Sequence, residues 1–161
     1  MSDDSDRIAA LVAELESARG EFAAVVGGLR REQLDAKRLV GEWGLREIVA
    51  HLGYWAGNAA EAMHQAELGS AARFGVSDAA VEERNALVAR VARETDLATA
   101  RAREEAAFAA LVERVDQADP AWLDEATSTG ETVGSLVHED GVDHYREHAG
   151  DLRIAIQGSA P

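Results

Sequence analysis

The chain contains no cysteine, and this absence excludes several kinds of chemistry. Without cysteine there is no disulfide, no thiolate ligand for a metal and no cysteine nucleophile. If the protein uses thiol chemistry, the thiol must therefore arrive with a small molecule.

Positive charge is also in short supply. Lys and Arg total 16 against 30 Asp and Glu, and the formal net charge is −14. This net negative charge repels nucleic acid and anionic membrane surfaces, so we expect neither as a partner. No apolar run approaches the roughly 18 residues of a membrane span, and the acidic, polar start does not resemble a secretory signal. We therefore expect a cytoplasmic protein.

Residues that interrupt helices or favour strands are scarce. There are two prolines in 161 residues, aromatic residues make up 5%, and no β-branched run alternates with period two. Alanine, leucine, glutamate and arginine, which are strong helix formers, dominate instead. The composition therefore predicts an all-α fold.

Apolar residues recur with helical period in four segments, approximately residues 5–29, 45–67, 78–116 and 131–157. Thr95-Asp96 interrupts the third segment, which we expect to form either one long bent helix or two helices in tandem. Gly44 is the expected N-cap of the second segment. Amphipathic helices with short links form bundles, so the sequence predicts one four-helix-bundle domain over residues 1–161. Close packing of alanine-rich helices is also compatible with a homodimer.

Three histidines lie where a bundle could bring them together. His144 and His148 are four residues apart, so they share one helix face, and that face carries the apolar residues of the last segment. The same spacing holds zinc in the H-E-x-x-H motif. His51 lies at the edge of the apolar stripe of the second segment. Three imidazoles would leave coordination positions open for water or substrate, and nitrogen ligands without thiolate suit zinc, nickel, copper or iron(II).

A simpler interpretation is that these are core histidines with satisfied hydrogen bonds, because an HxxxH pair is common in helices. The other two histidines are not expected to be ligands. His64 points away from His51 on the same helix and should be solvated. His138 lies off the inner face of the last segment, where it could contact a neighbouring helix or a dimer partner.

Two motifs far apart in the chain resemble a known family. Residues 43–55, WGLREIVAHLGYW, resemble the second-helix signature of the DinB/YfiT-like superfamily, and residues 143–148, DHYREH, resemble its last-helix HxxxH. The pattern is also similar to the N-terminal domain of mycothiol-dependent maleylpyruvate isomerases. The resemblance implies an up-down-down-up four-helix bundle that binds one divalent metal through His51, His144 and His148.

The resemblance also implies a function. Our leading hypothesis is a metal-dependent enzyme, a thiol S-transferase or isomerase that acts on a small electrophile with mycothiol or a similar thiol as cosubstrate. Zinc is the favoured metal, with nickel or iron as alternatives. Two other functions stay open: a hydrolase whose metal activates water, and a non-catalytic protein that binds a small molecule or confers self-resistance.

Several other residues are candidates for roles at such a site. Glu47 and Asp140 each precede a candidate ligand by one helical turn, and either could orient an imidazole or act as a base. The alternative is that both are solvated acids on a helix rim. The candidates for substrate contact are Tyr54, Trp55, Asn58, Arg84 and Asn85, although a tryptophan in a bundle is more often part of the core.

Overall fold

The computed structural model describes residues 2–158, with side chains from residue 5 onward. Over this range the regular structure is helical, and extended residues pair only in two isolated bridges, Val40 with Trp43 and Ala126 with Thr132. The prediction of an all-α fold is therefore confirmed.

The α-helices are α1 (Ser2–Gly27), α2 (Arg31–Leu34), α3 (Leu45–Glu67), α4 (Asp78–Arg93), α5 (Leu97–Asp116), α6 (Val133–His138) and α7 (His144–Gly158). Two short 3₁₀ turns, η1 (Ala71–Arg73) and η2 (Pro120–Asp124), lie in the connections. A π-helical segment, η3 (Glu139–Asp143), joins α6 to α7 without a break.

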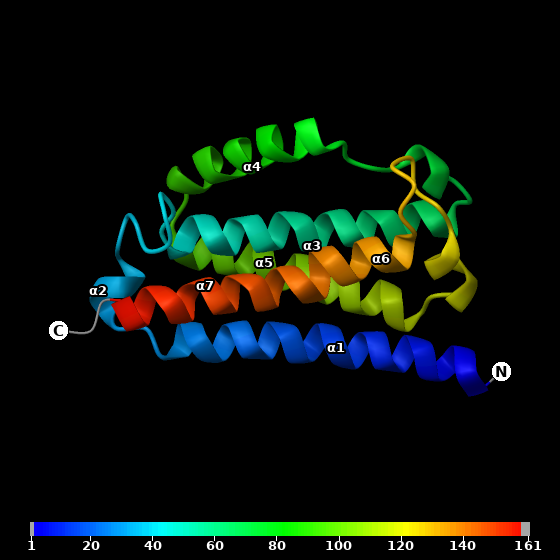
Figure 1. Cartoon of the computed structure of the whole chain (residues 1–161), viewed down its shortest axis with the longest axis horizontal. Coiled ribbons are helices and arrows are strands. Elements are labelled where there is room, and N and C mark those ends of the chain that lie inside the picture. The colour runs from blue at the N-terminus through cyan, green and yellow to red at the C-terminus, as the bar shows by residue number, and fades with distance from the viewer. Residues whose placement is uncertain (1, 159–161) are drawn as a thin grey trace.

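Four long elements form the bundle: α1, α3, α5 and the continuous unit α6–η3–α7 (Figure 1). In Figure 1, α1 and α7 run in one direction while α3 and α5 run in the other. This is the up-down-down-up order that the family resemblance implied. Among the described residues, no helix is both long and apolar enough to cross a bilayer.

Helix α3 lies at the centre of the structure and contacts α4, α5, α6, η3 and α7. Its predicted stripe is buried, from Leu45 through Trp55 to Met63. The stripe of the first helix is also in the core: Ile8, Leu15, Phe22 and Leu29 are buried, and Leu11, Val12, Val25 and Val26 pack against them. Helical periodicity alone therefore located the core faces of these two helices.

The predicted break at Thr95-Asp96 is present. Asp96 caps α5 by accepting a hydrogen bond from the Thr99 backbone N–H at 2.6 Å. The chain reverses direction there, so α4 runs antiparallel to α5 and lies across α3 on the outside of the bundle (Figure 1). The sequence predicted the break but not the reversal of direction. The reversal depends on the packing of α4 against α3.

Gly44 is the N-cap of α3, as predicted. A Cβ atom at this position would lie 2.5 Å from the backbone oxygen of Ala36, so no larger capping residue fits without moving the preceding loop. The loop packing therefore requires glycine where α3 begins, about two helical turns before His51.

The last helix was predicted to be continuous, but it contains the π-helical segment η3. A π turn inserts one residue relative to an α-helix, which rotates the following helix by about 100°. His144 is the first residue of α7, directly after this insertion. At Gly141, within η3, a Cβ atom would overlap the side chains of Leu15 and Leu111. The insertion therefore helps to set the direction in which the α7 histidines point.

Candidate metal centre

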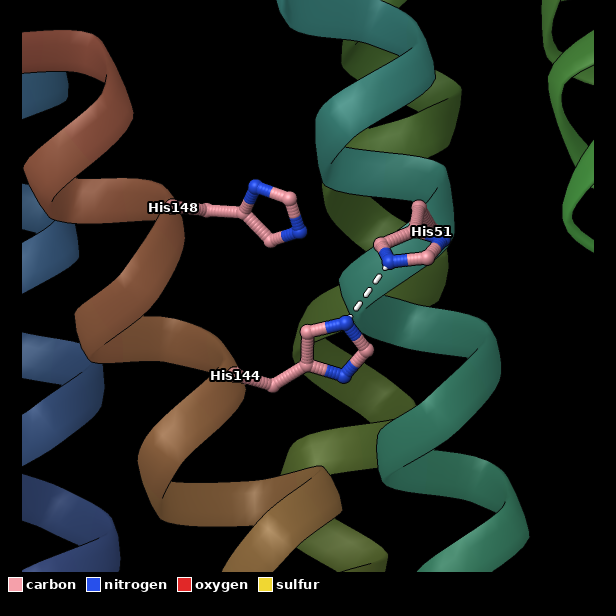
Figure 2. A group of neighbouring side chains, drawn as sticks. All are labelled: His51, His144 and His148. Carbon is pink, nitrogen blue, oxygen red and sulfur yellow. Dashed lines mark hydrogen bonds between the residues drawn. The ribbon is translucent and has the colours of Figure 1, made fainter.

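His51, His144 and His148 meet between α3 and α7 (Figure 2). One ring nitrogen from each residue lies within 4.8 Å of the other two. The Nε2 atoms of His51 and His144 are 2.8 Å apart, and the His144 and His148 rings stack with centroids 5.2 Å apart. The structure thus brings together the three histidines that the sequence singled out.

Burial keeps two of these imidazoles neutral. His51 is 4% exposed, and burial, together with the neighbouring His144 and His148, lowers its pKa to about 3. Burial and the neighbouring His148 likewise lower the pKa of His144 to about 4. Near neutral pH both rings are therefore uncharged, the protonation state in which imidazole binds a metal.

One of the three rings is oriented by a carboxylate. The Nδ1 of His148 lies 3.1 Å from Oδ2 of Asp151, and a proton on Nδ1 would leave Nε2 unprotonated and able to bind a metal. Asp151 was missed in the sequence, although an acid three residues after a helical histidine is near enough to reach it. Among the described residues, no carboxylate bonds His51, whose Nδ1 is buried without a hydrogen-bond partner.

The donor set fits a divalent cation. Zinc bonds imidazole nitrogen at about 2.0–2.1 Å, which separates the nitrogens of a tetrahedral site by roughly 3.3 Å. In the structure, the Nε2 atoms of His51 and His144 are closer than this, at 2.8 Å, and the ligand nitrogens of the three histidines lie within 4.8 Å of one another. Small side-chain movements would therefore turn the His51–His144 hydrogen bond into a shared ligand set. Three neutral nitrogens and no thiolate suit zinc, nickel, copper or iron(II).

Two tryptophans border the histidines. The Trp43 ring lies 4.9 Å from the His51 ring, centroid to centroid, and the Trp55 ring lies 6.4 Å from that of His144. The indole N–H of Trp55 donates to Oδ1 of Asn85 on α4 at 2.8 Å. Trp55 and Asn85 were predicted to contact substrate, whereas Trp43 was noted only as part of the family motif. Both rings therefore lie beside the histidine group.

Glu47 has a different partner from the one predicted. Its carboxylate is buried and accepts a hydrogen bond from Nε of Arg93 at 3.3 Å. His51 lies one turn away, but none of the hydrogen bonds in the described part of the chain joins the two. Glu47 therefore links α3 to the end of α4.

Asp140 is buried within η3. Its Oδ2 accepts a hydrogen bond from Nδ2 of Asn58 on α3 at 2.9 Å, and burial raises its pKa to about 7. Asp140 does not bond His144, but both residues line the same cavity. The carboxyl group can therefore exchange a proton with a molecule in that cavity near neutral pH.

Two cavities, of about 290 and 210 Å³, open between α3, α4 and η3. They share the lining residues Trp55, Val81, Glu139 and Asp140. The larger cavity also contains Asn58, and the smaller one contains Asn85 and reaches His144. We call these two volumes together the η3 cavity.

Tyr54 and Arg84 do not line the η3 cavity. Tyr54 lines a separate apolar cavity of about 370 Å³ between α3, α4 and α5. Arg84 is half-buried on α4, beside Asn85, but belongs to neither lining. Of the five residues predicted to contact substrate, Trp55, Asn58 and Asn85 therefore face the η3 cavity.

The remaining histidines lie outside the group. His64 is half-buried and lies within 3.3 Å of Arg114 and 3.2 Å of Glu67, so it is less solvated than predicted. His138 bonds Glu14 of α1 at 2.9 Å, the contact with a neighbouring helix that its position allowed.

Comparisons with known proteins found a matching family and a similar solved structure. The family model of the DinB superfamily matches residues 14–151, a range that includes all three histidines. A solved structure, the crystal structure of the mycothiol-dependent maleylpyruvate isomerase, aligns with a TM-score of 0.68 at 20% identity. The alignment covers 90% of this chain and 60% of that chain, so the shared part is the helical fold. No curated protein sequence matches the chain.

Proposed function

Because the chain belongs to the DinB superfamily, we propose that it is a metal-dependent enzyme in which His51, His144 and His148 hold one divalent cation. The proposal is carried by the convergence of three imidazole nitrogens within 4.8 Å from two facing helices. Zinc suits this set best, with nickel or iron as alternatives.

The proposed reaction is transfer or isomerisation of a small electrophile by a thiol. The similar structure is named as a mycothiol-dependent isomerase, and this chain has no cysteine of its own, so mycothiol or a similar small thiol would be the cosubstrate. A bound cation would supply Lewis acidity that lowers the pKa of a thiol or water.

The protein's own residues have distinct parts in this proposal. Asp151 orients His148, and the buried surroundings of His51 and His144 keep both rings uncharged. Trp43 and Trp55 lie beside the group. Asp140, held by Asn58, takes up or releases a proton in the η3 cavity.

A hydrolase is the second candidate, and Asp140 is the observation that favours it. A carboxyl group with a pKa of about 7 beside the cavity is suited to take a proton from attacking water. The two functions differ in their need for thiol. The transferase or isomerase requires an added small thiol for turnover, whereas the hydrolase turns over in buffer alone.

Metal content tests the proposal directly. Mass spectrometry of the purified protein should find about one divalent metal per chain, and the His148→Ala variant should lose it. His64→Ala is the matched control, because His64 lies on α3 outside the group, and it should retain the metal. If the protein binds no metal even after incubation with zinc and nickel, the proposal is wrong.

A further inference from the structure

The two ring nitrogens of His51 lie in different surroundings. Nε2 faces the other histidines and lies 2.8 Å from Nε2 of His144, along the dashed line in Figure 2. Nδ1 is buried, and no described residue forms a hydrogen bond with it. A buried N–H that lacks an acceptor is unfavourable, so a proton on Nδ1 would need a partner.

A metal-binding role for Nε2 would place a proton on Nδ1. A neutral imidazole has one N–H and one lone pair, and it is the lone pair that binds a metal. The hydrogen bond to His144 allows His51 to keep its proton on Nε2. If Nε2 is a ligand instead, the proton lies on Nδ1, and the ring then requires an acceptor on its other side.

Asn85 of α4 lies near His51 and has the chemistry of such an acceptor. It lines the same cavity as His144. Burial and the two neighbouring histidines lower the pKa of His51 to about 3, and the side chain of Asn85 opposes this shift as a hydrogen-bond acceptor does. Because Nε2 already bonds His144, Nδ1 is the nitrogen available to Asn85. The bond is incomplete in the structure, since Nδ1 has no partner at ordinary hydrogen-bond distance and angle.

Trp55 orients the amide of Asn85. Its indole N–H can only donate, and it donates to Oδ1 at 2.8 Å, so the oxygen of the amide rather than its nitrogen faces α3. Trp55 and His51 are four residues apart on one face of α3, and their rings meet edge to face with centroids 6.5 Å apart. Because a carbonyl oxygen has two lone pairs, Oδ1 can accept from both side chains.

We propose that Asn85 is a positioning residue of the metal centre, whose Oδ1 accepts the Nδ1–H of His51 and so holds Nε2 of that ring toward the other two histidines. This role rests on the proposed function, because it requires His51 to bind a metal through Nε2. It gives α4, which lies outside the four-helix bundle, a direct part in the site. The alternative is that Asn85 only attaches α4 to Trp55.

Zinc affinity, measured by competition with a chelator, tests this role. Asn85→Leu removes the acceptor at nearly constant shape and should weaken zinc binding about tenfold or more. Asn85→Asp retains an acceptor oxygen and should bind zinc at least as tightly as the wild type does. Arg93→Gln is the matched control, because Arg93 also joins α4 to α3, through Glu47, but lies outside the histidine group. It should leave zinc binding unchanged.

The proton on Nδ1 gives a second readout, which the attachment of α4 alone would not change. In the zinc-loaded wild type, the Nδ1–H of His51 should give an NMR signal that is protected from exchange with water. Asn85→Leu should move this signal upfield and speed its exchange, whereas Asn85→Asp should preserve it. An unchanged signal in Asn85→Leu, or an equal loss of zinc affinity in Asn85→Leu and Arg93→Gln, would overturn the proposal.

The result is distinguishable from failure of the proposed function, because zinc binding by the wild type is measured in the same series. A wild type that binds no zinc would overturn the proposed function and this inference with it. A wild type that binds zinc, beside an Asn85→Leu variant that binds it equally tightly, would overturn this inference alone.

Discussion

The pKa of Asp140 and the pKa values of His51 and His144 are shifted in opposite directions by the same cause. Burial disfavours the charged form of each group, so it raises the pKa of the acid and lowers that of the bases. Between about pH 4 and 7 the folded state keeps a proton on Asp140 that the unfolded chain has lost. Asp140 therefore makes the protein less stable as pH rises through this window.

Replacing Asp140 by Asn should remove that dependence, since an amide can still accept the hydrogen bond from Asn58. We expect the free energy of unfolding of Asp140→Asn, relative to the wild type, to rise by about 1–3 kcal/mol between pH 5 and pH 8. Urea unfolding of the two chelated proteins at several pH values measures this. A difference that does not change with pH would contradict the raised pKa.

Asp151 gives a second prediction at the residue scale. Loss of a carboxylate that orients a metal-binding imidazole typically weakens metal affinity 10–100-fold. Because the Asp151 side chain is 37% exposed, we expect Asp151→Asn to weaken zinc binding by about tenfold, the lower end of that range. Competition with a chelator measures the affinity, and Asp116→Asn, at the exposed end of α5, should leave it unchanged.

At the scale of elements, α3 and α5 approach each other closely at Gly53. A Cβ atom at Gly53 would lie 2.9 Å from Cα and 3.2 Å from Cβ of Glu104. These atoms belong to or adjoin the backbone and cannot move aside by rotation of a side chain. One turn later, a Cβ atom at Gly57 would meet only the Ala107 side chain, at 4.0 Å. The two glycines therefore have different roles in the same helix.

Alanine substitutions should separate these roles. Gly53→Ala should lower the free energy of unfolding by about 1–3 kcal/mol, because it forces α3 and α5 apart. Gly57→Ala should leave it unchanged or raise it by up to about 1 kcal/mol, because alanine favours the helix. Chemical denaturation of both variants tests the pair. Equal effects would show that the close approach at Gly53 does not limit packing.

At the scale of the whole molecule, one buried carboxylate connects three helices. Glu104 of α5 accepts two hydrogen bonds from Arg19 of α1, both at 2.8 Å, and one from the Tyr145 hydroxyl of α7 at 2.6 Å. Burial and the neighbouring Glu104 raise the pKa of Tyr145, so the phenol stays protonated and donates. Tyr145 follows His144, so this network also fixes the rotation of α7 where the histidines lie.

Tyr145→Phe should therefore destabilise the fold, since it removes a hydrogen bond to a charged acceptor. We expect a loss of about 1–3 kcal/mol in the free energy of unfolding. Tyr54→Phe is the matched control, because no hydrogen bond of its hydroxyl occurs in the described structure, and it should change stability by less than about 0.5 kcal/mol. Similar losses in both variants would show that the bond to Glu104 contributes little.

The sequence by itself determined the fold class, the core faces of α1 and α3 and the three histidines. Helical periodicity is a property of each segment alone, so the stripes from Ile8 to Leu29 and from Leu45 to Met63 could be predicted before any contact was known. His144 and His148 share a face because they are four residues apart. His51 belonged to the group because it lies at the edge of the apolar stripe of the second segment, and the family motif supported that assignment.

Only the tertiary structure decided which side chains meet across helices. Glu47 pairs with Arg93 because α4 reverses over α3, and Asp140 reaches Asn58 because η3 inserts a residue before α7. The bond of Glu104 to Tyr145 was missed for the same reason. Asp151 is different, because it lies three residues after His148 on one helix and spacing alone could have indicated that bond. A contact between helices depends on their rotation and separation, and these are set by packing of the whole bundle, which spacing within one segment does not encode.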